Sequence, residues 1–206
     1  MSRWFGRLMR LWRRWPLPGP LCNLVLMLRW RCLIHPMARI DHPLALRLGR
    51  GVRIGRCTLR CRGRAGHAVV LGDRVALHDG VLLDALDGFI EIGHDTTLNP
   101  YCVLYGTGGL RIGAHCGVAT QTVVVAANHS FDRPDMPIMQ QPLRTAGIHI
   151  ADDVWLGAGC RVLDGSHLAQ GCVVAAGAVV TGRFEQGSVL GGVPARLLKM
   201  REGFPR

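Results

Sequence analysis

The sequence repeats every six residues through its C-terminal half. Six successive units begin with an aliphatic residue, and in the first five a compact residue follows four positions later. An amphipathic helix repeats about every 3.6 residues and a half-buried strand about every two, so neither explains a sustained period of six. A chain wound as a triangular coil does, because each unit forms one side and one corner. The aliphatic positions are Ile150, Leu156, Val162, Leu168, Val174 and Val180, and the compact positions are Val154, Cys160, Ser166, Cys172 and Ala178.

The same unit recurs less regularly towards the N-terminus. Its spacing stretches around residues 60–70, 83–92 and 104–112, which predicts longer corners. A larger break from Ala127 to Gly147 predicts a polar loop that leaves the coil, a place where function tends to lie. From about residue 48 onward we therefore expect an all-β chain, a parallel β-helix whose stacked coils share one core. The earlier aliphatic positions are Ile54, Leu71, Leu77, Ile92, Leu98, Ile112 and Val118, and the compact ones are Thr58, Val75, Val81, Thr96, Cys102, Cys116 and Thr122.

Four of the eight cysteines occupy the compact position of the repeat. Cys102, Cys116, Cys160 and Cys172 are therefore interpreted as small buried hydrophobic residues, which argues against a catalytic cysteine. The sequence shows no CxxC pair and no Cys/His cluster with zinc-ligand spacing. It also lacks the pattern of a cleavable secretory signal, so we expect reduced thiols and a cytoplasmic protein.

Basic residues are concentrated near the N-terminus. Residues 1–64 contain 15 arginines and a single acidic residue, whereas residues 65–206 are mildly acidic. Residues 1–15 would place apolar and arginine side chains on opposite sides of a helix, and a second apolar stretch, too short and too charged to span a bilayer, covers Leu21–Ile34. We expect residues 1–47 to form a basic amphipathic segment beside an anionic membrane, at its inner face. The alternative is a helical cap on the β domain, and nucleic acid is not expected because no recognised module accompanies the charge.

Residues 48–206 resemble the hexapeptide-repeat acyltransferases, especially those that O-acetylate galactosides, maltose and polysaccharides. The resemblance rests on the order and spacing of Asn128–Phe131, Ile150–Cys160, Gly177–Thr181 and Gly192–Arg196 on the six-residue repeat. It implies a left-handed parallel β-helix, a homotrimer with active sites between subunits, and acetyl-CoA as co-substrate, with no metal. Left-handed crossovers go against the usual rule for parallel strands, so the handedness comes from the resemblance alone.

The resemblance also implies roles for individual residues. His129 matches the catalytic base, which suits the removal of a hydroxyl proton because imidazole titrates near neutrality; the alternative is an ordinary loop histidine. Among the substrate-binding positions, Asn99 matches one that contacts the acceptor or orients the site, and Trp155 matches one that lines the cleft near the thioester arm. The alternatives are a corner residue for Asn99 and a surface aromatic for Trp155. At Gly182-Arg183 the sequence departs from relatives that carry a lysine directly after the threonine. The positions that match contacts with acetyl-CoA are Ala158, Ala176, Thr181, Arg183, Arg196 and Lys199.

The expected function is the transfer of an acetyl group to a sugar hydroxyl, in a lipid-linked or surface polysaccharide because of the basic N-terminal segment. One alternative on the same fold is a γ-class carbonic anhydrase, which needs three histidine ligands around zinc. His78, His94, His115 and His129 could face one cleft, but the close histidine pair of that class is absent from the sequence. A second alternative is a non-catalytic β-helix that docks partners or a membrane through its N-terminal arm.

Overall fold

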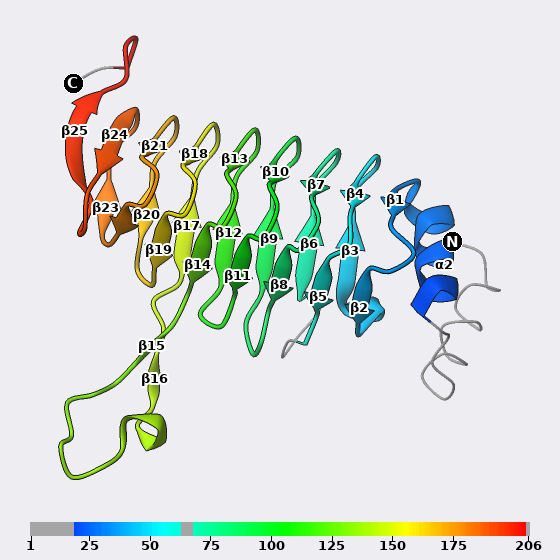
Figure 1. The fold of residues 1–206 in the computed structure, drawn as a ribbon, viewed down its shortest axis with the longest axis horizontal. Coiled ribbons are helices and arrows are strands. Elements are labelled where there is room, and N and C mark those ends of the chain that lie inside the picture. Colours follow the sequence, from blue (N-terminus) through cyan, green and yellow to red (C-terminus); the bar gives the residue numbers. More distant parts are fainter. Residues whose placement is uncertain (1–18, 63–67, 205–206) are drawn as a thin grey trace.

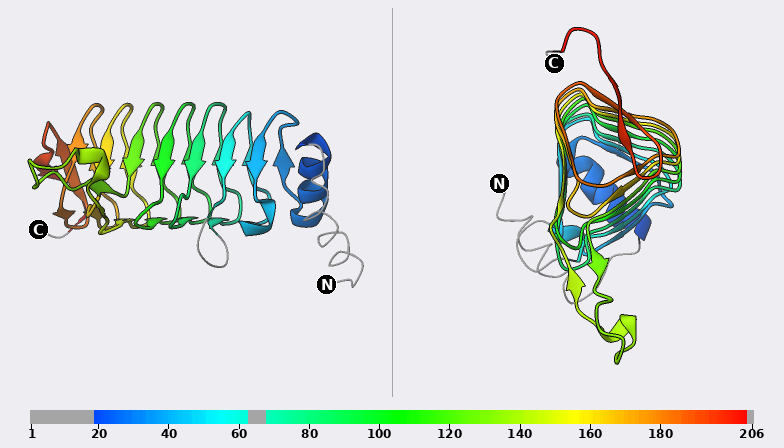
Figure 2. Two further views of the ribbon diagram at one scale, coloured as in Figure 1. Left: turned by 90° about the horizontal axis from the view of Figure 1, so that it is seen from below. Right: turned by 90° about the vertical axis from the view of Figure 1, so that its left-hand side faces the viewer.

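The protein is a triangular solenoid with a helix across one end (Figures 1 and 2). The computed structural model describes residues 19–62 and 68–204. Three parallel sheets run along the solenoid, and each coil contributes one strand to each sheet. Sheet A comprises β1 (Leu33–Ile34), β4 (Arg53–Ile54), β7 (Ala76–Leu77), β10 (Thr97–Leu98), β13 (Gly117–Val118), β18 (Trp155–Leu156), β21 (Val173–Val174), β24 (Ser188–Gly191) and β25 (Arg196–Met200).

The other two sheets have seven strands each. Sheet B comprises β2 (Arg39–Asp41), β5 (Thr58–Arg60), β8 (Leu82–Asp84), β11 (Val103–Tyr105), β14 (Val123–Val125), β19 (Arg161–Leu163) and β22 (Val179–Val180). Sheet C comprises β3 (Leu46–Leu48), β6 (Val69–Leu71), β9 (Ile90–Ile92), β12 (Leu110–Ile112), β17 (Ile148–Ile150), β20 (His167–Leu168) and β23 (Arg183–Phe184). Short 3₁₀ turns lie at Pro43–Ala45 and Ile138–Gln140. The predicted left-handed parallel β-helix of hexapeptide repeats is confirmed.

The six-residue period corresponds to the inward positions of the coils. Every predicted aliphatic position is at most 3% exposed, and successive ones pair in register, as Leu98 does with Val118 and Leu156 with Val174. The compact positions are also buried, with one exception. Thr58 is half-exposed, and Cys57 lies inside instead, 2% exposed, with its thiol 3.1 Å from the His78 carbonyl oxygen. The prediction for Thr58 was wrong because the corner after β4 is one residue shorter than the repeat.

Two of the three predicted longer corners are present. More residues separate β5 from β6 and β8 from β9 than separate most other neighbouring strands. The prediction for residues 104–112 was wrong, because β11 and β12 are joined by a connection of ordinary length and the extra residues extend the strands. The break at Ala127–Gly147 forms a hairpin that projects from the edge between sheets B and C, made of β15 (Asn128–His129) and β16 (Leu143–Arg144) (Figures 1 and 2). The hairpin therefore projects from the solenoid, near the C-terminal coils.

The N-terminal end of the solenoid is closed by α2 (Gly19–Trp30). Cys22 and Leu26 are buried against the first coil, and the Asn23 side-chain amide donates to the carbonyl of Ala38 at 3.1 Å. This part of the N-terminal segment is therefore a cap, and the first coil starts at Leu33, ahead of the boundary expected at residue 48. The helix expected over residues 1–15 lies outside the described residues. None of the helices described in 19–62 and 68–204 is long and apolar enough to cross a bilayer.

Replacing one inward leucine should cost much of the stability of the solenoid. Leu104 is 0% exposed at the centre of β11, so Leu104→Ala should lower the free energy of unfolding by about 2–5 kcal/mol, from lost burial and the cavity that remains. Leu28→Ala is the matched control, because Leu28 is 76% exposed on α2 and should cost at most about 0.5 kcal/mol. Denaturant unfolding of both variants measures the difference. Equal losses would contradict the assignment of inward positions.

Candidate active site

His129 lies at the base of the hairpin. It pairs with Leu143 across β15 and β16 and is half-buried, while its neighbour Asn128 is exposed. The Nδ1 atom of His129 is buried and makes no hydrogen bond with any described residue. The short ladder therefore fixes the imidazole at the base of the hairpin.

The hairpin is ordered from within by Gln141. Its side-chain amide donates to the carbonyls of Arg133 and Met136 at 2.8 and 3.0 Å, and its Oε1 accepts the Arg133 backbone N–H at 3.3 Å. Asp164 holds the returning strand, because its carboxylate accepts the backbone N–H groups of Ala146 and Gly147 at 2.8 and 2.9 Å. Both residues hold the segment that carries His129. No sequence pattern marks Gln141, whereas Asp164-Gly165 is a usual turn pair.

A second group of predicted residues lines the edge between sheets A and B. Asn99 directly follows β10, and its side-chain amide donates to the Val118 carbonyl at 3.1 Å. Further along this edge, Ala158 and Ala176 are exposed and lie in successive coils, joined by the Gly177 N–H to the Ala158 carbonyl at 2.9 Å. A Cβ added at Gly159 or Gly177 would meet nothing within 4 Å. The edge is therefore lined by small residues, against which an extended ligand can lie close to the backbone.

The remaining predicted residues divide between two places. Trp155 is 58% exposed on the outer face of sheet A, in the same coil as Ala158. Arg196 and Lys199 are exposed on β25, which pairs antiparallel with β24 at the C-terminal end, so they follow the small-residue edge. Thr181 and Arg183 are exposed on the other side of the coil, at and after the edge between sheets B and C.

One chain therefore does not bring all the predicted residues together. His129, Thr181 and Arg183 belong to the edge between sheets B and C, together with the hairpin. The edge between sheets A and B, with the adjoining strands of sheet A, holds Asn99, Trp155, Ala158, Ala176, Arg196 and Lys199. The two edges are separated by the whole width of sheet B (Figure 2).

The four histidines considered for a zinc site do not converge. His78 follows β7 at the edge between sheets A and B, His129 is on the hairpin, and His94 and His115 lie at the third edge. The rings of His94 and His115 are edge-to-face, with centroids 4.9 Å apart, and Asp95 is close to both. However, two guanidinium nitrogens of Arg74 donate to the Asp95 carboxylate at 2.7 and 2.6 Å and hold its pKa well below the usual range. The Asp95 carboxylate is therefore already paired with Arg74, and the two rings beside it are exposed.

All eight cysteines are buried. Burial raises the pKa of Cys22, Cys32 and Cys102 to about 11 and that of Cys57 to about 12. A thiol with so high a pKa holds its proton at neutral pH and is a poor nucleophile. The interpretation of Cys102, Cys116, Cys160 and Cys172 as packing residues is confirmed by their burial at 3% exposure or less.

These thiols should be unreactive until the protein unfolds. At about pH 8 a disulfide reagent such as dithionitrobenzoate should titrate almost no thiol in the native protein, because both exposure and the thiolate form are missing. Unfolding in denaturant should release all eight. A thiol that reacted within seconds in the native protein would show an accessible, activated cysteine and contradict this account.

Known proteins resemble this chain in sequence repeat and in fold. The family model described as bacterial transferase hexapeptide (six repeats) matches residues 147–182. A Mycobacterium tuberculosis protein assigned as an acetyltransferase is 28% identical over 75% of this chain and 50% of its own length. An Escherichia coli protein assigned as a lipopolysaccharide biosynthesis O-acetyl transferase is 27% identical over 68% of this chain and 75% of its own. The chain thus spans only half of the mycobacterial relative.

Solved structures share the fold at low sequence identity. A variant of the N-acyltransferase AntD from Bacillus cereus, in complex with dTDP and coenzyme A, superposes with a TM-score of 0.59 at 20% identity, over 87% of this chain and 88% of that chain. A galactoside acetyltransferase in complex with coenzyme A gives a TM-score of 0.51 at 22% identity, over 54% and 55% of the two chains. The six-residue repeats at 147–182 are therefore similar to those of bacterial hexapeptide transferases, and the solved structures share the fold of this chain.

Proposed function

We propose that this protein transfers an acetyl group from acetyl-CoA to a hydroxyl of a sugar, with His129 as general base. The observation that carries the proposal is the pairing of a hexapeptide-repeat coil with one projecting hairpin that presents a histidine at its base. The Escherichia coli relative, assigned as an O-acetyl transferase of lipopolysaccharide biosynthesis, supports a sugar hydroxyl as the acceptor.

The chemistry needs few protein groups. The His129 imidazole would accept the proton of the acceptor hydroxyl while its oxygen attacks the thioester carbonyl. As the carbon–sulfur bond breaks, the imidazolium would return the proton to the departing thiolate. No covalent enzyme intermediate is required when both substrates lie in one site, which agrees with the buried cysteines. The small residues at Ala158 and Ala176 would flank the extended arm of acetyl-CoA, and Arg196 and Lys199 would meet its phosphates.

We further propose that two neighbouring chains of a homotrimer complete each site. The outer face of sheet B carries apolar side chains from β8 to β22, interrupted by Arg161 on β19. The outer face of sheet C instead carries Glu91, Arg111, His149 and Arg183. An apolar face of this length is normally covered by a partner. If sheet B faces a threefold axis, the hairpin edge of one chain meets the small-residue edge of the next. The apolar residues on this outer face are Leu82, Val103, Tyr105, Val123, Val125, Leu163 and Val179.

The hairpin itself supports this arrangement. Phe131, Ile138, Met139 and Leu143 are each about half or more exposed, at 73%, 53%, 78% and 49%. Apolar side chains gathered on one projecting arm are typical of a segment that packs on another molecule. A neighbouring chain at this position would cover them.

A peripheral position at the inner face of the membrane remains part of the proposal. On α2, Leu21, Leu24 and Leu28 are 47%, 48% and 76% exposed, so the cap presents an apolar stripe outward. Arg29 lies in the last turn of α2, and Arg31 directly follows the helix. An apolar stripe beside arginines is the arrangement expected of a surface that lies against anionic headgroups, where a lipid-linked sugar would be presented.

Incubation with radiolabelled acetyl-CoA and a membrane extract tests the function. We expect label in glycan or glycolipid products, released by mild alkali because an acetyl ester is formed. Denatured protein under the same conditions serves as the control. Failure to label any glycan or glycolipid would contradict acetyl transfer to a sugar.

A further inference from the structure

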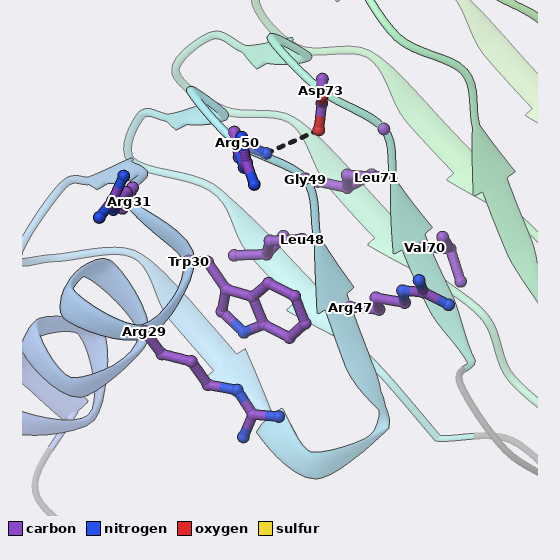
Figure 3. A pocket seen from close by; sticks show the side chains of 11 residues that line it. Arg29, Trp30, Arg31, Arg47, Leu48, Gly49, Arg50, Val70, Leu71 and Asp73 are labelled. Carbon is purple, nitrogen blue, oxygen red and sulfur yellow. Dashed lines mark hydrogen bonds between the residues drawn. The ribbon is translucent and has the colours of Figure 1, made fainter. Parts of the chain in front are cut away.

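A basic pocket lies at the opposite end of the solenoid from the hairpin. Its volume is about 590 Å³, and it lies between the end of α2 and the first two coils, against β3 and β6. Figure 3 shows the arginine side chains around the ring of Trp30. The pocket is lined by Arg29, Trp30, Arg31, Arg47, Leu48, Gly49, Arg50, Val70, Leu71, Gly72 and Asp73.

The charge of this pocket is largely uncompensated. Four arginines line it against one carboxylate, that of Asp73, whose Oδ1 accepts the backbone N–H of Arg50 at 2.8 Å. Among the described residues, Arg31, Arg47 and Arg50 form no ion pair, whereas Arg56, Arg60 and Arg74 in the same part of the chain each have an aspartate partner. Several guanidinium groups around one cavity, without matching acids, favour a bound anion.

The chain's own N-terminal segment does not suit this pocket. Residues 1–18 contain five arginines and no acidic residue, so they would add positive charge to positive charge. The ligand that fills this pocket must instead carry negative charge. Guanidinium forks match phosphate oxygens in geometry and charge, and a dianionic phosphate can engage two or more of them.

The walls of the pocket are apolar as well as basic. The indole of Trp30, over which the Arg29 guanidinium lies at 4.9 Å from the ring centroid, packs against the core beside Leu48 and Val70. The outer face of α2 continues this apolar character through Leu24 and Leu28. A ligand that fits both features carries a phosphate next to an apolar group.

We propose that this pocket binds the phosphate or diphosphate group of an anionic lipid. Free diphosphate presents the same chemical group, so it can serve as a probe of the pocket. The proposal deepens the membrane contact proposed above, but it does not depend on acetyl transfer, because the pocket shares no residue with either proposed substrate edge.

Charge reversal in the full-length protein tests the pocket. The pair Arg47→Glu and Arg50→Glu removes two of its guanidinium groups and leaves the main-chain hydrogen bond of Arg50 in place. The matched pair Arg39→Glu and Arg53→Glu makes the same change of net charge at exposed arginines outside the pocket. Calorimetric titration with inorganic diphosphate should show at least about a tenfold weaker affinity for the pocket pair than for the control pair.

A second experiment distinguishes a lipid headgroup from a soluble phosphate as the ligand of the pocket. Sedimentation with vesicles of phosphatidylglycerol and phosphatidylcholine in equal amounts should show the same selective loss for the pocket pair if a lipid headgroup is bound. Loss for diphosphate alone would identify a soluble phosphate as the ligand and overturn the lipid assignment. Equal losses in both pairs, or no binding of either probe by the native protein, would overturn the pocket itself. Acetyl transfer to a soluble acceptor should be unchanged in the pocket pair, so failure of the proposed function remains distinguishable.

Discussion

His129→Ala should lower kcat by about 10²- to 10⁴-fold, the range expected when a positioned general base is removed. The half-buried ring sits on a short ladder whose backbone pairing does not depend on the side chain, so the hairpin should persist. KM should change little, because the interaction lost is made mainly in the transition state. Steady-state kinetics with acetyl-CoA and a labelled acceptor measure both constants.

A matched histidine separates this effect from a general loss of fold. His42→Ala alters an exposed histidine in the first coil, at the far end of the solenoid, and should leave kcat unchanged. His129→Gln tests the chemistry further, since it keeps a polar side chain but cannot accept the proton, and should be as inactive as the alanine variant. Near-native activity of either His129 variant would identify another base or a non-catalytic protein.

Val123→Glu together with Val125→Glu should dissociate the assembly and abolish most of the activity. Both side chains point outward from β14 at the centre of the apolar face of sheet B, so each chain should still fold. Arg161 lies in register with position 123 and could face a glutamate there, whereas position 125 lies between Tyr105 and Leu163. At a threefold axis the glutamate at position 125 would therefore be buried without a partner, at a cost of several kcal/mol for each interface. Sedimentation velocity should report a particle of one chain, 22.5 kDa, in place of three.

The control places a single glutamate on another face. Val70→Glu changes an outward valine of β6 on sheet C, which is half-buried like Val123. It should leave the assembly intact, because sheet C already carries charged side chains on its outer surface. A monomeric native protein, or a trimer that survives glutamates on sheet B, would remove this face as the interface.

Much of the fold follows from the six-residue period alone. Burial of an aliphatic residue on each side and a compact residue near each corner is a packing requirement, so positions such as Leu156 and Cys160 could be assigned from spacing. The period fails where a corner changes length, as at Cys57 and Thr58, because a one-residue deletion shifts which side chain points inward. The first coil at Leu33 was missed since its units are too irregular to register as a repeat.

Less of the candidate site than of the fold could be predicted from the sequence. Spacing marks the long break and therefore His129, but it does not reveal that Gln141 organises the hairpin through three hydrogen bonds, because those depend on the folded loop. It also cannot show that Asn99 and Ala158 lie across sheet B from His129. In the proposed trimer each site takes residues from two chains, so these residues lie far apart within any one chain. No local sequence pattern shows which edge of one chain meets which edge of the next.

Mixed trimers of two inactive variants test the shared site most directly. His129→Ala removes the proposed base, and Ala158→Trp fills the small-residue edge, which is exposed and so should tolerate the larger side chain. Two different tags isolate the trimers that contain both chains. In each such trimer, whichever variant supplies two of the chains, one site of the three has both His129 and Ala158 intact. The mixed trimers should therefore have about one third of the native activity. Mixed trimers as inactive as the two parents would contradict the account, since a site built within a single chain cannot be restored by mixing.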